Sequence, residues 1–249
     1  MRITTINTIE TSSICDNSCP YCPAKDQAKH RKVGFMDMDT FAAALEWVRI
    51  YSDRGTQREL NLFGVGEPTL NPNIVEMVRL ARIVLPEHLP VHLNTNGNRF
   101  TEDLAWALKD AGITEIDVTG HDARATAKTI RILKKVGIPG RVSFDFALQP
   151  NNWANQVDWF EPDYSYPCPW LGRGQVMVMS DGRVTRCCID AFGKGILGHV
   201  LFNLDLLEIS PFSLCANCHQ TEPEQECLEK EASPLETGSA SAGRVGQVE

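Results

Sequence analysis

Short strand-like runs alternate with longer helical segments along the first 150 residues. The runs fall at residues 3–9, 58–63, 91–95, 113–119 and 141–147, and each has the length and composition of a strand. Between them, apolar residues recur every three or four positions, which is the period of an amphipathic helix. This alternation predicts an α/β fold of about five to six βα units around a mostly parallel sheet, either an open doubly wound sheet or part of a (β/α) barrel.

Several of the helical segments carry start and stop signals. Asn71–Pro72 predicts the N-cap and first residue of a helix that ends before Pro86. Thr101 predicts the N-cap of the next helix, and Gly112 predicts its end. A further helix is expected from about residue 123 to residue 136.

The second part of the chain follows a different pattern. Only about 20 residues, several of them proline or asparagine, lie between the fifth run and Cys168, too few for another full helix and strand. Ser180–Gly182 then joins two strand-like runs in a predicted hairpin. From about Thr221 the chain is rich in Glu, Ser, Gly and Ala, which is typical of a flexible tail. The expected parts are residues 1–150, a small second module at 151–220, and a flexible acidic tail at 221–249.

Composition and charge narrow the classes of function. The 249 residues are 43% hydrophobic and 22% charged, the balance of a folded chain with a sizeable core. No stretch approaches the roughly 20 apolar residues of a membrane helix, and the first residues show no secretory apolar region. We therefore expect a cytoplasmic protein with no membrane partner. The net charge of −8 lies mostly in the tail, and the weakly acidic remainder argues against generic nucleic-acid binding.

Three cysteines follow the first strand-like run at CxxxCxxC spacing. In a reducing compartment, clustered thiols such as Cys15, Cys19 and Cys22 are metal ligands or redox groups more often than disulfides. Three soft ligands in a tight loop suit an iron–sulfur cluster that keeps one iron open. A zinc ion with His30 as its fourth ligand is the alternative.

The segment CDNSCPYC, at residues 15–22 after the first strand, resembles the cluster loop of the radical S-adenosylmethionine (radical SAM) superfamily. The resemblance implies a partial (β/α) TIM-like barrel and a [4Fe–4S] cluster on Cys15, Cys19 and Cys22. It also implies that the open iron of this cluster binds SAM, and that a flavodoxin-like or ferredoxin-like protein donates the electron.

Other segments match the same family. FGVGEP, at residues 63–68, is similar to the family's GGEP segment, with Val65 between the two glycines. This similarity implies that Gly66 and Glu67 contact SAM, and Tyr21 matches the aromatic position near the adenine. Strand-end positions imply further cofactor contacts at Asn94, Asn96 and Thr119, where turn formation and helix capping are the alternative roles.

A second cysteine group lies in the last third of the chain. Cys168, Cys187, Cys215 and Cys218 resemble the SPASM/Twitch extension of many radical SAM enzymes. One auxiliary [4Fe–4S] cluster in a Twitch-type module is expected, because only Cys227 remains for a second one. Cys188 is the alternative to Cys187, and a structural zinc held by the same four thiols stays open.

The resemblance implies an enzyme that reductively cleaves SAM to a 5′-deoxyadenosyl radical, which abstracts a hydrogen atom from substrate. A fully ligated auxiliary cluster leaves no iron for substrate, so its expected role is to accept an electron, as in small Twitch dehydrogenases. A redox-neutral isomerase or epimerase acting on a peptide or modified nucleotide is the alternative. A third reading is a non-enzymatic iron–sulfur carrier or zinc scaffold, which gives no reason for GVGEP.

The substrate itself is not identified by the sequence, and a small molecule, a peptide and a nucleotide all remain open. The catalytic base and the hydrogen donor are equally open. Candidates for substrate contacts lie after the fifth run and in the second module, at Asp145, Gln149, Asn151, Trp153 and Arg173.

Overall fold

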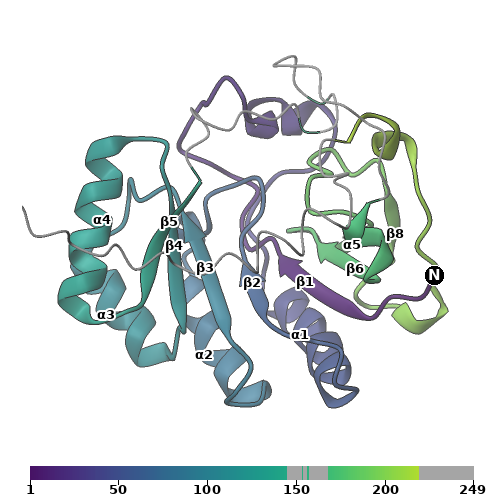
Figure 1. Cartoon of the computed structure of the whole chain (residues 1–249), viewed down its shortest axis with the longest axis horizontal. Helices are drawn as coiled ribbons and strands as arrows, with labels where there is room; N and C mark the ends of the chain where they lie inside the picture. The colour runs from purple at the N-terminus through teal and green to yellow at the C-terminus, as the bar shows by residue number, and fades with distance from the viewer. Residues whose placement is uncertain (145–152, 154–155, 157–167, 219–249) are drawn as a thin grey trace, which may run out of the picture.

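The computed structural model describes residues 1–144, 153, 156 and 168–218. Its centre is one eight-stranded sheet in the order β5-β4-β3-β2-β1-β6-β7-β8 (Figure 1). The first five strands are parallel to their neighbours, so the predicted βα alternation is confirmed. In the described residues this sheet has two open ends, as in a partial (β/α) barrel. The five strands are β1 (Thr5–Ile9), β2 (Leu60–Leu62), β3 (Val91–Thr95), β4 (Glu115–Thr119) and β5 (Gly140–Phe144).

Four helices follow the strands in turn and pack side by side in chain order along the sheet (Figure 1). They are α1 (Met38–Asp53), α2 (Ile74–Val84), α3 (Glu102–Ala111) and α4 (Ala123–Val136). Their apolar faces bury side chains such as Phe41, Met77 and Leu108 against the strands, which forms one continuous core. The predicted end of α3 at Gly112 is confirmed, because this residue has the left-handed φ of 92° that suits glycine.

The predicted start of α2 is wrong by two residues. The helix begins at Ile74, with Asn73 as its N-cap, and not at Pro72. The Asn71 side chain donates hydrogen bonds to the carbonyls of Thr11 and Met36. Its Oδ1 also accepts from the N–H of Asn73 at 2.9 Å, so Asn71 shapes the turn before α2 and fastens that turn to the segment after β1.

The predicted hairpin of the second module is confirmed, and it continues the main sheet. Strand β6 (Gln175–Val178) pairs in parallel with β1 and antiparallel with β7 (Arg183–Thr185), which pairs in turn with β8 (Ile196–His199). Gly182 turns the hairpin with φ of 82°. Short helical turns complete the described chain at η1 (Pro23–Lys29), η2 (Pro68–Leu70), α5 (Pro169–Gly172), η3 (Leu204–Leu206) and η4 (Ser213–Asn217).

Two expectations fall outside this description. The boundary expected near residue 150 and the tail expected from residue 221 both lie outside the described residues. Within the described ranges, no helix combines the length and the apolar character that a bilayer-spanning segment needs.

Candidate metal and cofactor site

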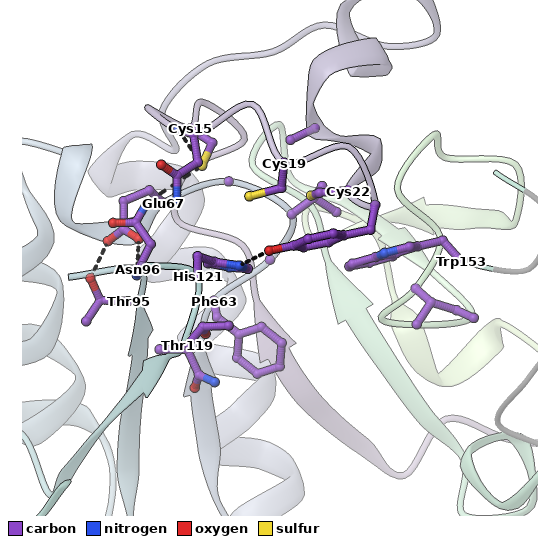
Figure 2. A pocket seen from close by; sticks show the side chains of 18 of the residues that line it. Cys15, Cys19, Cys22, Phe63, Glu67, Thr95, Asn96, Thr119, His121 and Trp153 are labelled. Carbon is purple, nitrogen blue, oxygen red and sulfur yellow. Dashed lines mark hydrogen bonds between the residues drawn. The ribbon is translucent and has the colours of Figure 1, made fainter. Parts of the chain in front are cut away.

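A pocket of about 260 Å³ lies at the carboxyl ends of β1 to β4, the edge at which parallel α/β sheets hold their ligands (Figure 2). Six separate segments of the chain form it: the first cysteine segment, the loop after β2, the end of β3, the end of β4, Trp153, and the segment that contains Cys188. The fold therefore brings together the predicted residues Cys15, Cys19, Tyr21, Cys22, Gly66, Glu67, Asn94, Asn96 and Thr119.

The three cysteines of the first segment all border this pocket (Figure 2). Burial raises the pKa of the Cys22 thiol to about 12 and also raises the pKa of Cys15, so both are protonated in the metal-free chain. Among the described residues, no three His, Cys, Asp or Glu side chains lie close enough together to hold a single metal ion. The fit to an iron–sulfur cluster rests on the donor set, since three soft thiols share one wall of the pocket.

The glycines after β2 are required by close contact with the segment after β1. A Cβ atom on Gly66 would lie 2.3 Å from the carbonyl oxygen of Ser12, and one on Gly64 would lie 2.3 Å from Cγ of Glu10. Glycine is therefore the residue that lets these two segments approach each other. Val65, between them, is buried in a cluster that also packs against Cys22. The backbone of the GVGEP segment thus forms one wall of the pocket beside the first cysteine segment.

The Glu67 carboxylate ties the ends of β2 and β3 together. It accepts hydrogen bonds from the hydroxyl of Thr95 at 2.8 Å, from the backbone N–H of Asn96 at 2.7 Å, and from the hydroxyl and N–H of Thr69 at 2.6 and 3.0 Å. The side chain is 2% exposed, and this burial raises the pKa of Glu67. The carboxylate therefore organises the loops of the pocket, and this role is additional to the SAM contact expected from the sequence.

Asn96 braces the first cysteine segment from the end of β3. Its amide nitrogen donates to the carboxylate of Asp16 at 2.8 Å and lies 3.8 Å from Sγ of Cys15. The neighbouring Asn98 donates to Asn17 at 2.8 Å. Two asparagines of the turn after β3, separated by Gly97, therefore hold the loop between the first two cysteines. Sequence reasoning placed Asn96 near a cofactor but did not predict these contacts.

Tyr21 and His121 both line the pocket and contact each other. The Tyr21 hydroxyl lies 2.9 Å from Nδ1 of His121, and the two rings stack with centroids 5.9 Å apart. Burial lowers the pKa of His121, which keeps its imidazole neutral near neutral pH. Asp122 beside it caps α4 by accepting from the N–H of Ala125 at 2.7 Å. The pairing joins residues 100 positions apart, and only the location of His121 after a strand hinted at it.

The second cysteine group gathers beside the same pocket. The Cys215 thiol interacts electrostatically with Cys187 and Cys168, and the buried Cys218 belongs to a cluster that packs against Cys187. The pKa of the Cys187 thiol is raised well above its ordinary value. The largest cause is a hydrogen bond with Cys188, and the second largest is burial. The four predicted ligands thus lie in one region of the second module, and thiols are ligands of both iron–sulfur clusters and zinc.

Two further residues connect the second group to the pocket. Cys188 lines the pocket, whereas Cys187, its neighbour in the chain, interacts with Cys215. Trp153 also lines the pocket and packs against both apolar clusters, the one that includes Cys218 and the one that contacts Cys22. The two cysteine groups therefore lie on either side of a shared apolar wall.

A buried ion pair, not predicted from the sequence, lies behind this wall. The Arg31 guanidinium donates two hydrogen bonds of 2.7 Å to the Glu10 carboxylate, and both side chains are fully buried. Glu10 also accepts from the N–H groups of Val65 and Ser180, and Nε of Arg31 donates to the carbonyl of Ala191 at 2.7 Å. The pair thus connects β1, the GVGEP segment and the loop after Cys188. A glutamate at the end of an apolar strand was its only sequence signal.

Of the remaining candidates that the structure describes, Trp153 lines the pocket and Arg173 does not. Asp145, Gln149, Asn151 and Cys227 lie outside the described residues. Arg173 lies at the amino end of β1, where its carbonyl accepts from the Thr4 hydroxyl at 2.6 Å. This position is at the opposite end of the strand from the pocket, and Arg173 does not belong to the described lining.

Comparisons with known proteins agree with this geometry. A model of the Radical SAM superfamily matches residues 9–155. The PqqA peptide cyclase of Gluconobacter oxydans (strain 621H) is 30% identical over 167 residues, which are 61% of this chain but only 43% of that protein. The match therefore spans less than half of the length of this curated relative.

Two solved structures share the fold. The crystal structure of BtrN in complex with AdoMet and 2-DOIA is similar with a TM-score of 0.63 and 22% identity, over 80% of this chain and 79% of that one. The selenomethionine structure of BtrN in an open conformation is similar with a TM-score of 0.59 and 21% identity, over 89% and 96% of the two chains. Both likenesses extend beyond the parallel strands into the second module.

Proposed function

The chain belongs to the radical SAM superfamily, and we propose that within it the chain is an oxidising enzyme with an auxiliary iron–sulfur cluster as electron acceptor. The observation that carries this proposal is that the second cysteine group lies beside the pocket that the first group lines, with Trp153 and Cys188 between them. A position beside the cofactor pocket suits an electron acceptor.

Cys15, Cys19 and Cys22 would hold the first [4Fe–4S] cluster, and Cys168, Cys187, Cys215 and Cys218 the auxiliary one. When bound, the first cluster and SAM supply a 5′-deoxyadenosyl radical that abstracts a hydrogen atom from substrate. The chain's own residues would position the cofactor: the backbone of Gly66 and Glu67, the ends of β3 and β4 at Asn94, Asn96 and Thr119, and the ring of Tyr21. Phe63 and Trp153 would exclude water from the pocket.

The names of the similar proteins support the substrate class that we propose. A peptide and a small molecule both appear in the names of the similar proteins. We favour a small molecule that loses two electrons and two hydrogens. A flavodoxin-like or ferredoxin-like donor would reduce the first cluster, and the free thiols suit a reducing, cytoplasmic location.

The class is tested by anaerobic purification, counting of iron and sulfide, and a search for 5′-deoxyadenosine after SAM and a reductant are added. Wild type should hold two clusters and form 5′-deoxyadenosine. Cys19→Ala should abolish this product, whereas Cys215→Ala should retain it while the oxidised product falls at least tenfold. Continued cleavage of SAM by the Cys19 variant, or zinc in place of iron at the second site, contradicts the proposal.

A redox-neutral isomerase or epimerase is the second candidate, and the position of Cys188 favours it. The Cys188 thiol lines the pocket and is therefore placed to return a hydrogen atom to a substrate radical. Mass spectrometry of the product separates the two candidates. Oxidation consumes SAM stoichiometrically and yields a product about two mass units lighter, whereas isomerisation leaves the mass unchanged and should stop in Cys188→Ala.

A further inference from the structure

Arg186 is a cation at the edge of the second cysteine group, outside the residues assigned so far. It follows the last residue of β7 and directly precedes Cys187. Its guanidinium lies over the ring of Phe212, 5.6 Å from the centroid. Nε of Arg186 is buried, and among the described residues it has no hydrogen-bond partner. A buried donor without a partner is uncommon in folded proteins and points to a group that the protein atoms do not supply.

The neighbours of Arg186 show where the missing partner of its Nε would lie. Arg186, Cys187, Cys188 and Gln175 share a cavity of about 10 Å³, and Oε1 of Gln175 is also buried without a partner among the described residues. The Arg186 charge acts on Cys215, where it lowers the thiol pKa against the larger raising effect of burial. The guanidinium therefore lies close to two of the four predicted ligands.

The charged side chains near the second cysteine group differ in whether they have partners. Arg186 forms no ion pair with any residue in the described part of the chain. Asp190 is the opposing charge near Cys187, and its carboxylate is held by hydrogen bonds from the Thr185 hydroxyl and from two backbone N–H groups. Arg183 is paired with Asp181 at 2.8 Å. Arg186 therefore has no ion-pair partner in the described chain, and its charge acts on the Cys215 thiol.

We propose that Arg186 raises the reduction potential of the auxiliary cluster and thereby makes it a better electron acceptor. The inference rests on the proposed function, which places that cluster on Cys168, Cys187, Cys215 and Cys218. Gaining an electron makes a cluster more negative, and a fixed cation in a partly buried site stabilises the reduced form more than the oxidised form. Nearby charge and hydrogen bonds to sulfur are the established determinants of such potentials.

The test is a redox titration of the intact holoenzyme, followed by electron paramagnetic resonance. Arg186→Met should lower the reduced-to-oxidised ratio of the auxiliary cluster about tenfold at a fixed potential, which equals 59 mV for a one-electron couple. Arg186→Lys keeps the charge and should recover most of this shift. Arg183→Met removes a neighbouring cation that is already paired, and its potential should equal that of wild type.

Three results would overturn the inference. The first is an Arg186→Met variant with two clusters and an unshifted auxiliary potential. The second is an equal shift in Arg183→Met. The third is failure of both Arg186→Met and Arg186→Gln to assemble the auxiliary cluster, which would make Arg186 a residue for assembly. Absence of an auxiliary cluster from wild type contradicts the proposed function instead, so the two failures are distinguishable.

Discussion

At the scale of single residues, Gly66 shows how the absence of a side chain shapes the pocket. A Cβ atom at this position would meet the carbonyls of Ser12 and Ile14 at 2.3 and 2.7 Å, and these backbone atoms immediately precede Cys15. Gly66→Ala should therefore displace the first cysteine segment, cost about 1–3 kcal/mol of stability, and reduce the iron held there. Thermal unfolding and iron counting measure both effects.

The matched control for this substitution is Gly34→Ala. A Cβ atom on Gly34 meets nothing within 4 Å, although Gly34 also lies against the segment after β1 through its hydrogen bond to Ser13. Its variant should stay within about 0.5 kcal/mol of wild type. Equal melting temperatures and equal iron contents for the two alanine variants would show that the close contact at Gly66 is not what the pocket needs.

Cys22 gives the metal-free chain a pH dependence of stability. Its pKa is raised to about 12 in the fold, against about 8.5 in an unfolded chain. The contribution of the neutral thiol is complete below pH 8.5 and is lost progressively above it, at up to about 1.4 kcal/mol per pH unit, because only the unfolded chain ionises there. Urea unfolding of chelated protein at pH 7.5, 8.5 and 9.5 should therefore show a shallower decline for Cys22→Ala than for wild type. Parallel declines would contradict this prediction.

Residue types at short spacing were predictable, and contacts between distant residues were not. The CxxxCxxC group and the GVGEP glycines are local patterns whose chemistry is legible in the sequence. The sequence could not show that the Glu67 carboxylate bonds to Thr95, or that Tyr21 faces His121. Both contacts depend on the order of strands in the sheet, which the residues themselves do not encode locally.

At the scale of elements, the N-cap of α4 links stability to the pocket. Asp122 caps α4 and Asp37 caps α1 with the same bond length of 2.7 Å, but only Asp122 adjoins His121. Alanine at either position should cost about 1 kcal/mol. Only Asp122→Ala should also weaken SAM binding, because it loosens the turn that carries His121 and Thr119. Calorimetry with SAM and thermal unfolding separate the effects, and equal SAM affinities in both variants would refute the link.

Elements were predicted better than their pairing. All five parallel strands and the hairpin around Gly182 were expected from their patterns, because strand and turn signals are local. Two features depend on tertiary contacts and could not be predicted from local patterns. They are the pairing of β6 with β1 and the start of α2 at Ile74. The first needs a register between segments about 170 residues apart. The second depends on the turn at Asn71, whose side chain bonds both to the N–H of Asn73 and to distant carbonyls.

At the scale of the whole molecule, the buried Glu10–Arg31 pair holds the parts together. Arg31→Met should destabilise the protein by about 3–5 kcal/mol, because it leaves the fully buried Glu10 charge without its partner. Glu10→Gln combined with Arg31→Met should recover a large part of this loss, since the buried charge is then absent as well. Denaturant unfolding of wild type, Glu10→Gln, Arg31→Met and the double variant measures the coupling between the two residues.

The control for this cycle is the exposed pair of Arg54 and Asp205, whose side chains are 48% and 37% accessible. Arg54→Met should change stability by less than about 1 kcal/mol, because solvent screens the charges of a surface pair. Two results would mean that the buried pair does not join the segments. One is a loss of stability in Arg31→Met as small as that in Arg54→Met, and the other is a double variant no more stable than Arg31→Met alone.

The pairing of β6 with β1 has a consequence for any attempt to exchange parts between enzymes. A chain cut before Cys168 would leave the edge of β1 without its neighbour, and Nε of Arg31 would lose the Ala191 carbonyl. Chimaeras that graft the carboxyl-terminal third onto a foreign barrel should consequently aggregate unless the recipient supplies a matching strand and arginine. Recombination in such a protein would succeed only where β1 and β6, and with them Arg31 and Ala191, come from the same parent.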